Sequence, residues 1–515
     1  MRSDLPPAVT TVEIGGAELE LRASIAGRRL SLPRCTVTYL CLYDDEIGKR
    51  AEDFAIRLEQ TGTDAAALHL ELTDIAFIIG CDGTLSVLRG GACPVPLYYS
   101  IAEKRLRFTT ALPVGKAALS RSGIIMAAAA ACQHSSYEPN AFTETPLAGW
   151  RRVRRASINR FVANRLDRSD IIDARPARAS SRERIAAEVH AAFMSYGQSQ
   201  AGIARSVLEV SGGFDSTLAA TTLSTPQDMH GISSVYPYYE FRDEVDVQAR
   251  VGRELGLERT ILDGTTLFPY APSDESVRWD EPSVFVTGIR HSEQVARFAA
   301  QRNAQRIYMG HGGDQCFTTD LTVKEGFVGN PVGRGPFSAE SWSALSTAMK
   351  TTSTSPWMAR SAGTFVYDAR QDIWVKERYG VTIRTPFSDL CIFRAGQLWS
   401  DYSAAKGKRP DKSILVEALG DYLPGAVVRR KGKAAYDGVW MRAYESHAGH
   451  IADCFDRAAD TLGHLGISAA WLIRRTQALG TWKPLSDREV LALYAVAFWL
   501  LAWELDRPKE LCWSS

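Results

Sequence analysis

The chain has 515 residues, 45% of them hydrophobic, and its 60 Lys and Arg residues nearly balance 59 Asp and Glu residues, leaving a net charge of +1. That length is too great for one ordinary core and predicts about two to four domains. The balanced charge excludes a chain that is attracted as a whole to nucleic acid or to an anionic membrane.

The first third of the chain is predicted to be rich in β-strands. Its apolar segments are expected to pair as two hairpins, residues 75–81 with 85–88 and residues 95–101 with 106–110. The pair Asp82-Gly83 is a strong turn signal between the first two of these strands. The Ala-rich residues 124–132 predict a helix.

Polar residues 164–182 are the best linker candidate, and strands alternate with helices beyond them. This alternation predicts a parallel α/β sheet. The predicted strands are residues 206–210, 232–236 and 306–309. The predicted helices are residues 182–196, one through 218–223, and an amphipathic one from about Asp243 to about Gly256. From about Ser338 the chain is expected to be helical, so we divide it into domains 1–170 and 183–515.

A membrane protein, a disulfide framework and a structural zinc site find little support in the sequence. The longest apolar run, residues 490–503, is shorter than the about 20 residues that span a bilayer, so a buried helix is expected there. The first ten residues lack the charged start and apolar run of a signal peptide. The nine cysteines form no C-x-x-C pair and no Cys/His cluster, which predicts reduced thiols in a cytoplasmic protein.

The sharpest signal is a glycine turn, Ser211-Gly212-Gly213-Phe214-Asp215-Ser216, between a predicted strand and a predicted helix. Backbone N–H groups at such a turn can surround phosphate oxygens, and the helix N-terminus adds partial positive charge. The hydroxyls of Ser211 and Ser216 can donate further hydrogen bonds. Bare phosphate would repel Asp215, so the natural partner of this carboxylate is Mg²⁺ bridging to the phosphate. The turn lacks the Gly-Lys-Ser/Thr ending of a Walker A loop.

A second glycine turn, Gly310-His311-Gly312-Gly313-Asp314, also follows a predicted strand. Ligands of an open parallel sheet sit outside the carboxyl ends of the strands, where such turns meet. Asp314 is therefore expected to reach the same metal-bound phosphate as Asp215. His311 either lines an acceptor pocket, with a catalytic role, or packs against the turn.

Together these turns resemble those of the asparagine synthetase family of ATP pyrophosphatases. In that family the first turn binds pyrophosphate, and the second supplies another Mg²⁺-binding aspartate. The family's Pro-Phe-x-Asp string is matched by Pro386-Phe387-Ser388-Asp389. Its lysine, three residues before an aromatic and after an arginine, is matched by Lys433, which precedes Tyr436 and follows Arg430. The resemblance implies that Lys433, or Lys431 if the register slips, stabilises charge developing at the adenylate.

The resemblance implies an α/β fold class with two domains. The N-terminal one would be a β-rich glutaminase-like (Ntn-type) domain, and the C-terminal one a parallel α/β ATP-pyrophosphatase domain of the adenine nucleotide hydrolase-like kind. ATP and Mg²⁺ are the implied cofactors, with Asp215 and Asp314 as metal ligands. The implied nucleotide-binding residues are Ser211, Gly212, Gly213, Asp215, Ser216, Gly312 and Gly313.

Residues 88–99 are similar to the Arg-Asp-x-x-Gly-x-x-Pro-Leu-Tyr-Tyr string of the family's glutaminase domain. A working glutaminase needs cysteine as residue 2, whose thiol attacks the amide while its own α-amine serves as base. Residue 2 here is Arg2, and no cysteine lies near the N-terminus. We therefore expect no release of ammonia from glutamine, which argues against an ordinary asparagine synthetase.

Ring-forming members of the family also lack the glutaminase activity. They include β-lactam and carbapenam synthetases, and lasso-peptide cyclases, which join a peptide's N-terminus to an Asp or Glu side chain. The second turn reads Gly-His-Gly-Gly-Asp-Gln, as in the cyclases, and the strand before the first turn reads Leu-Glu-Val. Glu209 in that strand needs a partner because the strand should be buried. We expect a lasso cyclase, with another ring-forming synthetase or another amide ligase as alternatives.

The implied reaction is adenylation of an Asp or Glu side chain, followed by attack of the peptide's N-terminal amine and release of AMP and pyrophosphate. The implied partners are a peptide substrate, a leader-peptide-binding protein and a protease, with no nucleic acid and no membrane. A scaffold that only binds peptide is disfavoured because it would need neither the aspartates nor the lysine. An ammonia-using asparagine synthetase stays open.

Two further segments have alternative interpretations. Five arginines, at positions 151, 152, 154, 155 and 160, either lie on a solvated strand and linker or bind an acidic peptide or a partner protein. The aromatic residues within 236–241 either contact a peptide or pack in the core.

Overall fold

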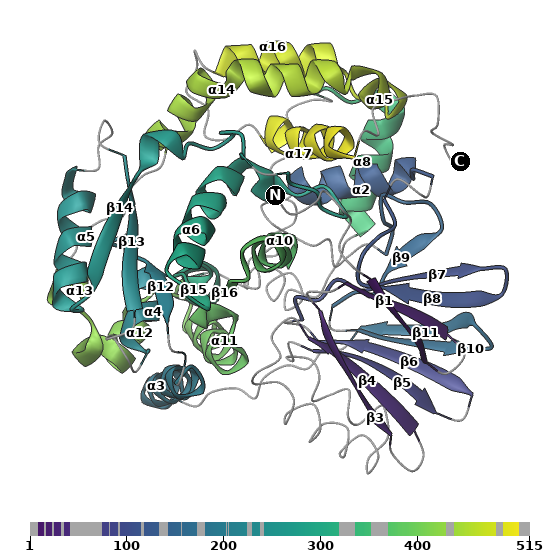
Figure 1. Ribbon diagram of the computed structural model, residues 1–515. Coiled ribbons are helices and arrows are strands. Elements are labelled where there is room, and N and C mark those ends of the chain that lie inside the picture. The colour runs from purple at the N-terminus through teal and green to yellow at the C-terminus, as the bar shows by residue number, and fades with distance from the viewer. Residues whose placement is uncertain are drawn as a thin grey trace.

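The computed structural model describes most of the chain, in segments separated by gaps. The described residues are 9–14, 17–22, 25–31, 35–41, 75–81, 83–90, 93–114, 118–132, 143–155, 157–171, 181–201, 203, 205–223, 229–236, 242–274, 276–318, 335–351, 369–428, 437–479 and 488–503. Figure 1 shows a β-rich part formed by the N-terminal third, an α/β part beside it, and a group of helices from the C-terminal region above both.

The β-rich part contains two sheets whose inner faces pack together. The first sheet has the order β1 (Val9–Ile14), β2 (Ala17–Arg22), β8 (Arg105–Thr109), β7 (Tyr98–Ala102) and β9 (Trp150–Arg152). The second has the order β11 (Arg165–Ile171), β10 (Ser157–Val162), β6 (Thr84–Arg89), β5 (Ala76–Cys81), β4 (Cys35–Cys41) and β3 (Ala26–Ser31). Side chains such as Leu19, Phe108, Ile78 and Phe161 form the shared core.

Both predicted hairpins are confirmed, because β5 pairs antiparallel with β6 and β7 with β8. The predicted helix is also confirmed, as α2 (Arg121–Cys132). The linker prediction is wrong for residues 165–171, which form β11 and pair with β10. The many charged residues of β11 suit an edge strand, because one face and one backbone edge of such a strand are exposed to water. A glutaminase-like (Ntn-type) identity for this part stays a prediction.

The α/β part contains the predicted parallel sheet. Its order is β14 (Glu258–Asp263), β13 (Met229–Val235), β12 (Ser206–Glu209), β15 (Arg306–Tyr308) and β16 (Thr382–Arg384), and all four pairings are parallel. The three predicted strands are confirmed as β12, β13 and β15, whereas β14 and β16 were not predicted. All five belong to one sheet, with β12 at its centre.

Helices cover both faces of this sheet (Figure 1). One face packs on α3 (Arg182–Ser199), α4 (Phe214–Thr221), α5 (Arg242–Glu254), α11 (Leu390–Ala405) and α12 (Ser413–Leu419). The other face packs on α6 (Ile289–Gln301) and α10 (Ala369–Tyr379). Successive residues of a strand point to opposite faces, so Leu208 of β12 joins the first core and Val207 the second.

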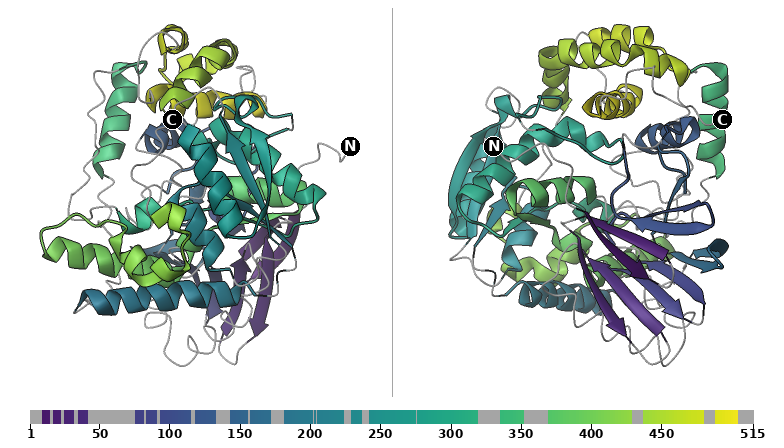
Figure 2. Two further views of the ribbon diagram at one scale, coloured as in Figure 1. Left: turned by 90° about the vertical axis from the view of Figure 1, so that its left-hand side faces the viewer. Right: turned by 45° about the vertical axis from the view of Figure 1, so that its right-hand side comes forward.

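The predicted helical C-terminal region is confirmed apart from β16; its helices α10, α11 and α12 lie on the sheet, and both views in Figure 2 show most of its other helices gathered at one end of the molecule. They are α8 (Ala339–Thr351), α14 (Asp437–Arg457), α15 (Ala459–His464), α16 (Ala469–Leu479) and α17 (Arg488–Ala502). The apolar run at 490–503 is mostly α17, whose Leu493 and Val496 are fully buried. Among the described helices, none combines the length and apolar composition needed to cross a bilayer.

The two parts share buried contacts. Helix α2 of the first part packs against α17 and α8 of the second. The Glu281 cluster, consisting of Tyr98, Arg152, Glu281 and Arg370, adds a charged contact between the parts. Arg152 forms an ion pair with Glu281, and the Tyr98 hydroxyl donates to the second Glu281 oxygen at 2.8 Å. Since the parts are so connected, the division into domains 1–170 and 183–515 stays a prediction.

Burial corrects the expectation of a solvated arginine segment. Arg152 is 2% exposed and Arg155 3% exposed, whereas Arg151 is exposed and pairs with Glu144 at 2.8 Å. Arg152 is buried because Glu281 supplies the opposite charge that a buried guanidinium requires. Of the aromatic segment at 236–241, Tyr236 packs partly buried against the core, and residues 237–241 lie outside the described residues.

Candidate functional site

The first glycine turn joins β12 to the N-terminus of α4. The Ser211 and Ser216 hydroxyls lie 2.9 Å apart, and the Gly213 backbone N–H donates to Ser211 Oγ at 3.2 Å. The side chain of Thr217 donates to the Gly213 carbonyl at 2.8 Å. These bonds stabilise the turn. It lies at the carboxyl edge of the sheet, at the positively polarised N-terminus of α4.

The second glycine turn joins β15 to α7 (Gly313–Phe317) and lies against the first. A Cβ atom added to Gly310 would lie 2.1 Å from the Ser216 backbone nitrogen, and one added to Gly313 would lie 2.4 Å from Asp215 Oδ1. Glycine is therefore required at Gly310, where a side chain would collide with the backbone of the first turn, whereas a side chain at Gly313 would displace the Asp215 carboxylate. The structure thus brings together the two motifs that the sequence placed about a hundred residues apart.

The carboxylates of the two turns converge on one ammonium group. Lys412 Nζ lies 2.7 Å from Asp215 Oδ2 and 2.6 Å from Asp314 Oδ1. We call these three residues the Asp215 cluster. Their side chains are partly open, with exposed fractions of 18% for Asp215, 21% for Lys412 and 41% for Asp314. Burial lowers the pKa of Lys412, but the two carboxylates outweigh it and hold that pKa above its usual value.

Lys412 was not predicted as a site residue. It lies just before α12, at the end of a stretch with several other basic residues. That stretch has no spacing that marks one lysine among the others, so only the folded arrangement of α11, α12 and the two turns identifies it.

The donor chemistry at the Asp215 cluster fits Mg²⁺. Mg²⁺ prefers oxygen ligands and commonly takes one or two protein carboxylates alongside phosphate oxygens and water. Asp215 and Asp314 supply two carboxylates that already lie within reach of a single cation, the Lys412 ammonium. Within the described ranges there is no gathering of three or more His, Cys, Asp or Glu side chains around a metal position.

Glu209 has the partner that its position in β12 demanded. Glu209 Oε1 lies 3.1 Å from Nε2 of His291, in the first turn of α6, and the same ring nitrogen lies 3.1 Å from the Ser234 hydroxyl of β13. Burial raises the pKa of Glu209, but His291 outweighs it and holds the pKa below its usual value. The pKa of His291 is raised, because the Glu209 carboxylate outweighs burial.

His311 follows β15 and lies within electrostatic reach of Glu209 and Asp314. Burial lowers the pKa of His311, and these two carboxylates oppose that effect. The His311 carbonyl accepts a hydrogen bond from Thr385 Oγ1 at 2.6 Å. Thr385 directly precedes the Pro-Phe-Ser-Asp string, so this string helps to hold the second glycine turn.

Asp389 of that string has a structural role. Its Oδ1 accepts hydrogen bonds from the backbone N–H groups of Cys391 at 2.9 Å and Ile392 at 3.3 Å, which caps α11. The predicted catalytic residue Lys433 lies outside the described residues, as do Lys431 and Tyr436.

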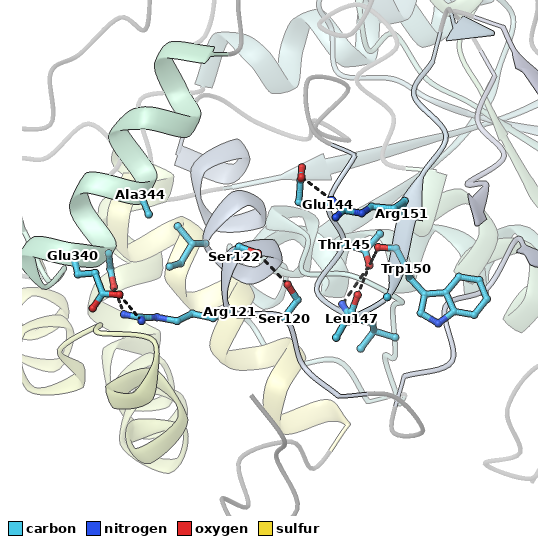
Figure 3. A pocket seen from close by; sticks show the side chains of 14 residues that line it. Ser120, Arg121, Ser122, Glu144, Thr145, Leu147, Trp150, Arg151, Glu340 and Ala344 are labelled. Atoms are coloured by element: carbon cyan, nitrogen blue, oxygen red, sulfur yellow. Dashed lines mark hydrogen bonds and ion pairs between the residues drawn. The ribbon is translucent and has the colours of Figure 1, made fainter. Parts of the chain in front are cut away.

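A separate cavity of about 560 Å³ lies between the β-rich part and α8. Figure 3 shows Arg121 reaching from α2 to Glu340 of α8 on one side, and Arg151 pairing with Glu144 on the other. Ser120, Leu147 and Trp150 also line it. Of the predicted site residues that the structure describes, none lies in its wall.

Comparison with known proteins gives limited help. No family model matches the chain, and no curated protein matches it. A glutamine-dependent NAD⁺ synthetase from Acinetobacter baumannii, solved with ADP, is similar at 17% identity and a TM-score of 0.18 over 29% of this chain and 29% of that one. A U34-tRNA thiolase from Methanococcus maripaludis, solved with a 4Fe-4S cluster, is similar at 14% identity and a TM-score of 0.21, over 48% of this chain and 82% of that one.

The chain thus spans less than a third of the length of the NAD⁺ synthetase. Superpositions this limited carry no conclusion about fold or chemistry.

Proposed function

We propose that this chain is an ATP-dependent ligase, which transfers AMP to a carboxylate and then lets an amine displace the AMP. One observation carries the proposal: two glycine turns pack together at the carboxyl edge of a parallel sheet, and their aspartates converge on one cation position. A core turn needs neither the glycines in contact nor the paired carboxylates. Together they suit a polyphosphate with a divalent cation.

The first turn supplies groups that can bind the phosphates. Its serine hydroxyls, its backbone N–H groups and the N-terminus of α4 all favour negative charge. Asp215 in the same turn would repel phosphate, so the site needs a cation between the two. Mg²⁺ bound by Asp215 and Asp314 would neutralise charge on the β- and γ-phosphates.

Lys412 has a place in the same mechanism. In the structure its ammonium neutralises Asp215 and Asp314. Once ATP and a divalent cation bring their own charges, Lys412 is free to turn to a phosphate oxygen, where a lysine acts as a point charge. Lys433 is proposed to stabilise the charge at the adenylate, as its resemblance implies.

At finer resolution, we propose that the product is a macrolactam in a lasso peptide precursor. The Gly-His-Gly-Gly-Asp-Gln sequence of the second turn and Glu209 in the strand before the first turn support this choice over other amide ligases. Both reacting groups would belong to one peptide, and holding them in contact replaces a bimolecular step, worth up to about 7–11 kcal/mol. A leader-peptide-binding protein and a protease are proposed as partners.

The decisive experiment is mass spectrometry of a candidate precursor peptide after incubation with the protein, the partner protease, ATP and Mg²⁺. We expect an ATP-dependent loss of one water from the processed peptide, with release of pyrophosphate. Asp215→Ala should abolish both signals, whereas Asp246→Ala, which removes an exposed carboxylate on α5, should change neither.

The other outcomes separate the levels of the proposal. If pyrophosphate is released with a small amino-acid substrate and no peptide loses water, the ligase proposal stands and the lasso proposal is wrong. If no carboxylate supports ATP–pyrophosphate exchange, the ligase proposal itself is wrong.

A further inference from the structure

We propose that His291, held by Glu209, is the general base that accepts the proton of the amine attacking the acyl-adenylate. This inference rests on the proposed ligase function and goes beyond it by assigning the second half-reaction to two residues. The resemblance to the asparagine synthetase family placed neither residue in a catalytic role.

The geometry is that of an imidazole oriented by a carboxylate. Glu209 Oε1 and the Ser234 hydroxyl both lie 3.1 Å from Nε2 of His291. When Nε2 carries the proton and donates it to Glu209, the ring's other nitrogen, Nδ1, has the free electron pair. Nδ1 makes no hydrogen bond with any residue that the structure describes. The His291 side chain is 23% exposed, so a substrate can approach the ring.

The pair lies at the same edge of the sheet as the glycine turns. Glu209 ends β12 two residues before Ser211, and Ser234 lies next to the end of β13, the neighbouring strand. His311, after the strand on the other side of β12, interacts electrostatically with both Glu209 and Asp314. The polar ends of three adjacent strands thus connect the His291 pair to the Asp215 cluster.

Core packing explains the position of Glu209 poorly. Glu209 occupies the face of β12 that Val207 fills with an apolar side chain. The Glu209 and His291 side chains are 20% and 23% exposed, and a partly open ion pair contributes little to stability. Glu209 Oε2 is out of contact with solvent and accepts no hydrogen bond from the described residues. A paired charge that contributes little to stability, at the edge where ligands bind, indicates a role in chemistry.

The same sheet also contains a second His–Glu pair, with which the first can be compared. His230, near the start of the same strand β13, has Nδ1 3.6 Å from Glu258 Oε2. Its other nitrogen is already engaged with the Thr260 hydroxyl at 2.9 Å. This second His–Glu pair lies at the amino edge, away from both glycine turns, so it should be irrelevant to catalysis.

The proposed step balances as follows. The lone pair of a neutral amine attacks the carbonyl carbon of the acyl-adenylate, and the new C–N bond forms while the C–O bond to AMP breaks. The electron pair of the broken bond leaves on the AMP phosphate. One proton of the attacking nitrogen passes to Nδ1 of the neutral imidazole, the form that His291 takes above its raised pKa, and Glu209 stabilises the imidazolium that results.

The test separates the two half-reactions in His291→Gln and Glu209→Gln, with His230→Gln as the matched control. Adenylation is measured as ATP–pyrophosphate exchange with the carboxylate substrate that supports it in the unaltered protein. Amide formation is measured with the same substrate. We expect exchange within about threefold of the unaltered protein and amide formation lower by about 10²–10⁴-fold, the usual contribution of a general base. His230→Gln should leave both rates unchanged.

Hydroxylamine provides a readout that a merely structural role would not change. It is neutral near pH 7 and captures acyl-adenylates as hydroxamates with little need of a base. We expect His291→Gln and Glu209→Gln to form hydroxamate at the unaltered rate, and Glu209→Asp to recover part of the amide formation. If exchange, hydroxamate and amide formation all fall together, or if amide formation is unaffected, the inference is wrong.

Failure of the ligase proposal looks different. In that case the unaltered protein shows no exchange with any carboxylate, and the assignment of His291 falls with it. If Glu209→Gln does not fold, His291→Gln decides, because glutamine can still donate to the Glu209 carboxylate.

Discussion

The Glu281 cluster and the Asp215 cluster both hold opposite charges close together, but they differ in what surrounds them. Arg152 and Glu281 are each 2% exposed, and the Tyr98 hydroxyl binds the carboxylate oxygen that Arg152 leaves free. Asp215, Lys412 and Asp314 are 18%, 21% and 41% exposed, and two carboxylates there share one ammonium. The first cluster is enclosed, whereas the second can exchange its cation with a ligand.

This difference shows how one fold uses charge in two ways. An enclosed pair is costly to break because the remaining partner stays buried and uncompensated. A partly open pair contributes little to stability, since water can replace either partner. The comparison therefore predicts that substitutions in the Glu281 cluster reduce stability, and that substitutions in the Asp215 cluster reduce ligand binding and turnover.

The largest expected effect is on turnover, in Asp215→Ala. Pyrophosphate release should fall by about 10³-fold or more, since the phosphates would lose a cation-mediated contact in the transition state. The midpoint of thermal unfolding should stay nearly unchanged, because Lys412 keeps Asp314 as a partner. Turnover that survives in Asp215→Ala would refute the role of this carboxylate.

The second prediction concerns stability, in Glu281→Gln. Arg152 and Arg370 would stay buried without their carboxylate, and we expect a loss of about 3–5 kcal/mol in the free energy of unfolding. Urea unfolding measures this loss. Glu340→Gln is the matched control, because it breaks an ion pair with Arg121 in which Glu340 is 75% exposed. That control should cost less than about 1 kcal/mol.

Equal costs in Glu281→Gln and Glu340→Gln would contradict the distinction between enclosed and open ion pairs. The Tyr98 hydroxyl gives an independent measurement. Burial and then the Glu281 carboxylate hold the pKa of Tyr98 well above its usual value. Spectroscopic titration of the tyrosines should show the Tyr98 pKa falling in Glu281→Gln.

The third prediction is a change in affinity, in Lys412→Met. ATP should bind about 10- to 100-fold more weakly, the contribution of one charge-assisted hydrogen bond. Without nucleotide, Mn²⁺ should bind more tightly, because Lys412 no longer competes for Asp215 and Asp314. Calorimetry of both ligands measures these changes. Lys408→Met, which removes an exposed lysine of the same basic stretch, should alter neither affinity.

The architecture of the α/β part could be predicted because its signals are local. The strands β12 and β15 each combine a short apolar run with a following glycine turn, and the two glycine turns have few other uses. The strands β14 and β16 could not be predicted in this way. β14 has an exposed or half-exposed side chain at every position, and β16 has three residues, so neither has a clear apolar pattern.

The site could be predicted only where its residues belong to a motif. Asp215 and Asp314 lie in glycine turns, and Glu209 was marked by its charge in an apolar strand. Lys412 lies just before α12 and His291 lies within α6, and the local sequence around each resembles any other amphipathic or basic segment. Their roles depend on how α12 and α6 pack on the sheet, and such long-range packing has no local signature.

The smallest expected effect is a pH dependence of stability, caused by the Glu209–His291 pair. The raised pKa of His291 stabilises the fold at pH values below about 6.5, the pKa of a histidine in the unfolded chain. This contribution is lost as the pH rises through the raised pKa. The lowered pKa of Glu209 stabilises the fold at pH values above about 4.3, the pKa of a glutamate in the unfolded chain. This contribution is lost as the pH falls through the lowered pKa. The pair therefore contributes most to stability between about pH 4.3 and pH 6.5.

Glu209→Gln should accordingly destabilise the protein more at about pH 5.5 than at about pH 8.5. Urea unfolding of both proteins at the two pH values measures the difference. His311 also responds to Glu209, and since this carboxylate raises the pKa of His311, its loss acts in the same direction. A cost that is equal at both pH values would mean that Glu209 and His291 are not an ion pair in the folded protein. The two residues would then form a neutral hydrogen bond. Such a bond would be an ordinary polar contact at a strand end, unlike the ion pair of the enclosed Glu281 cluster.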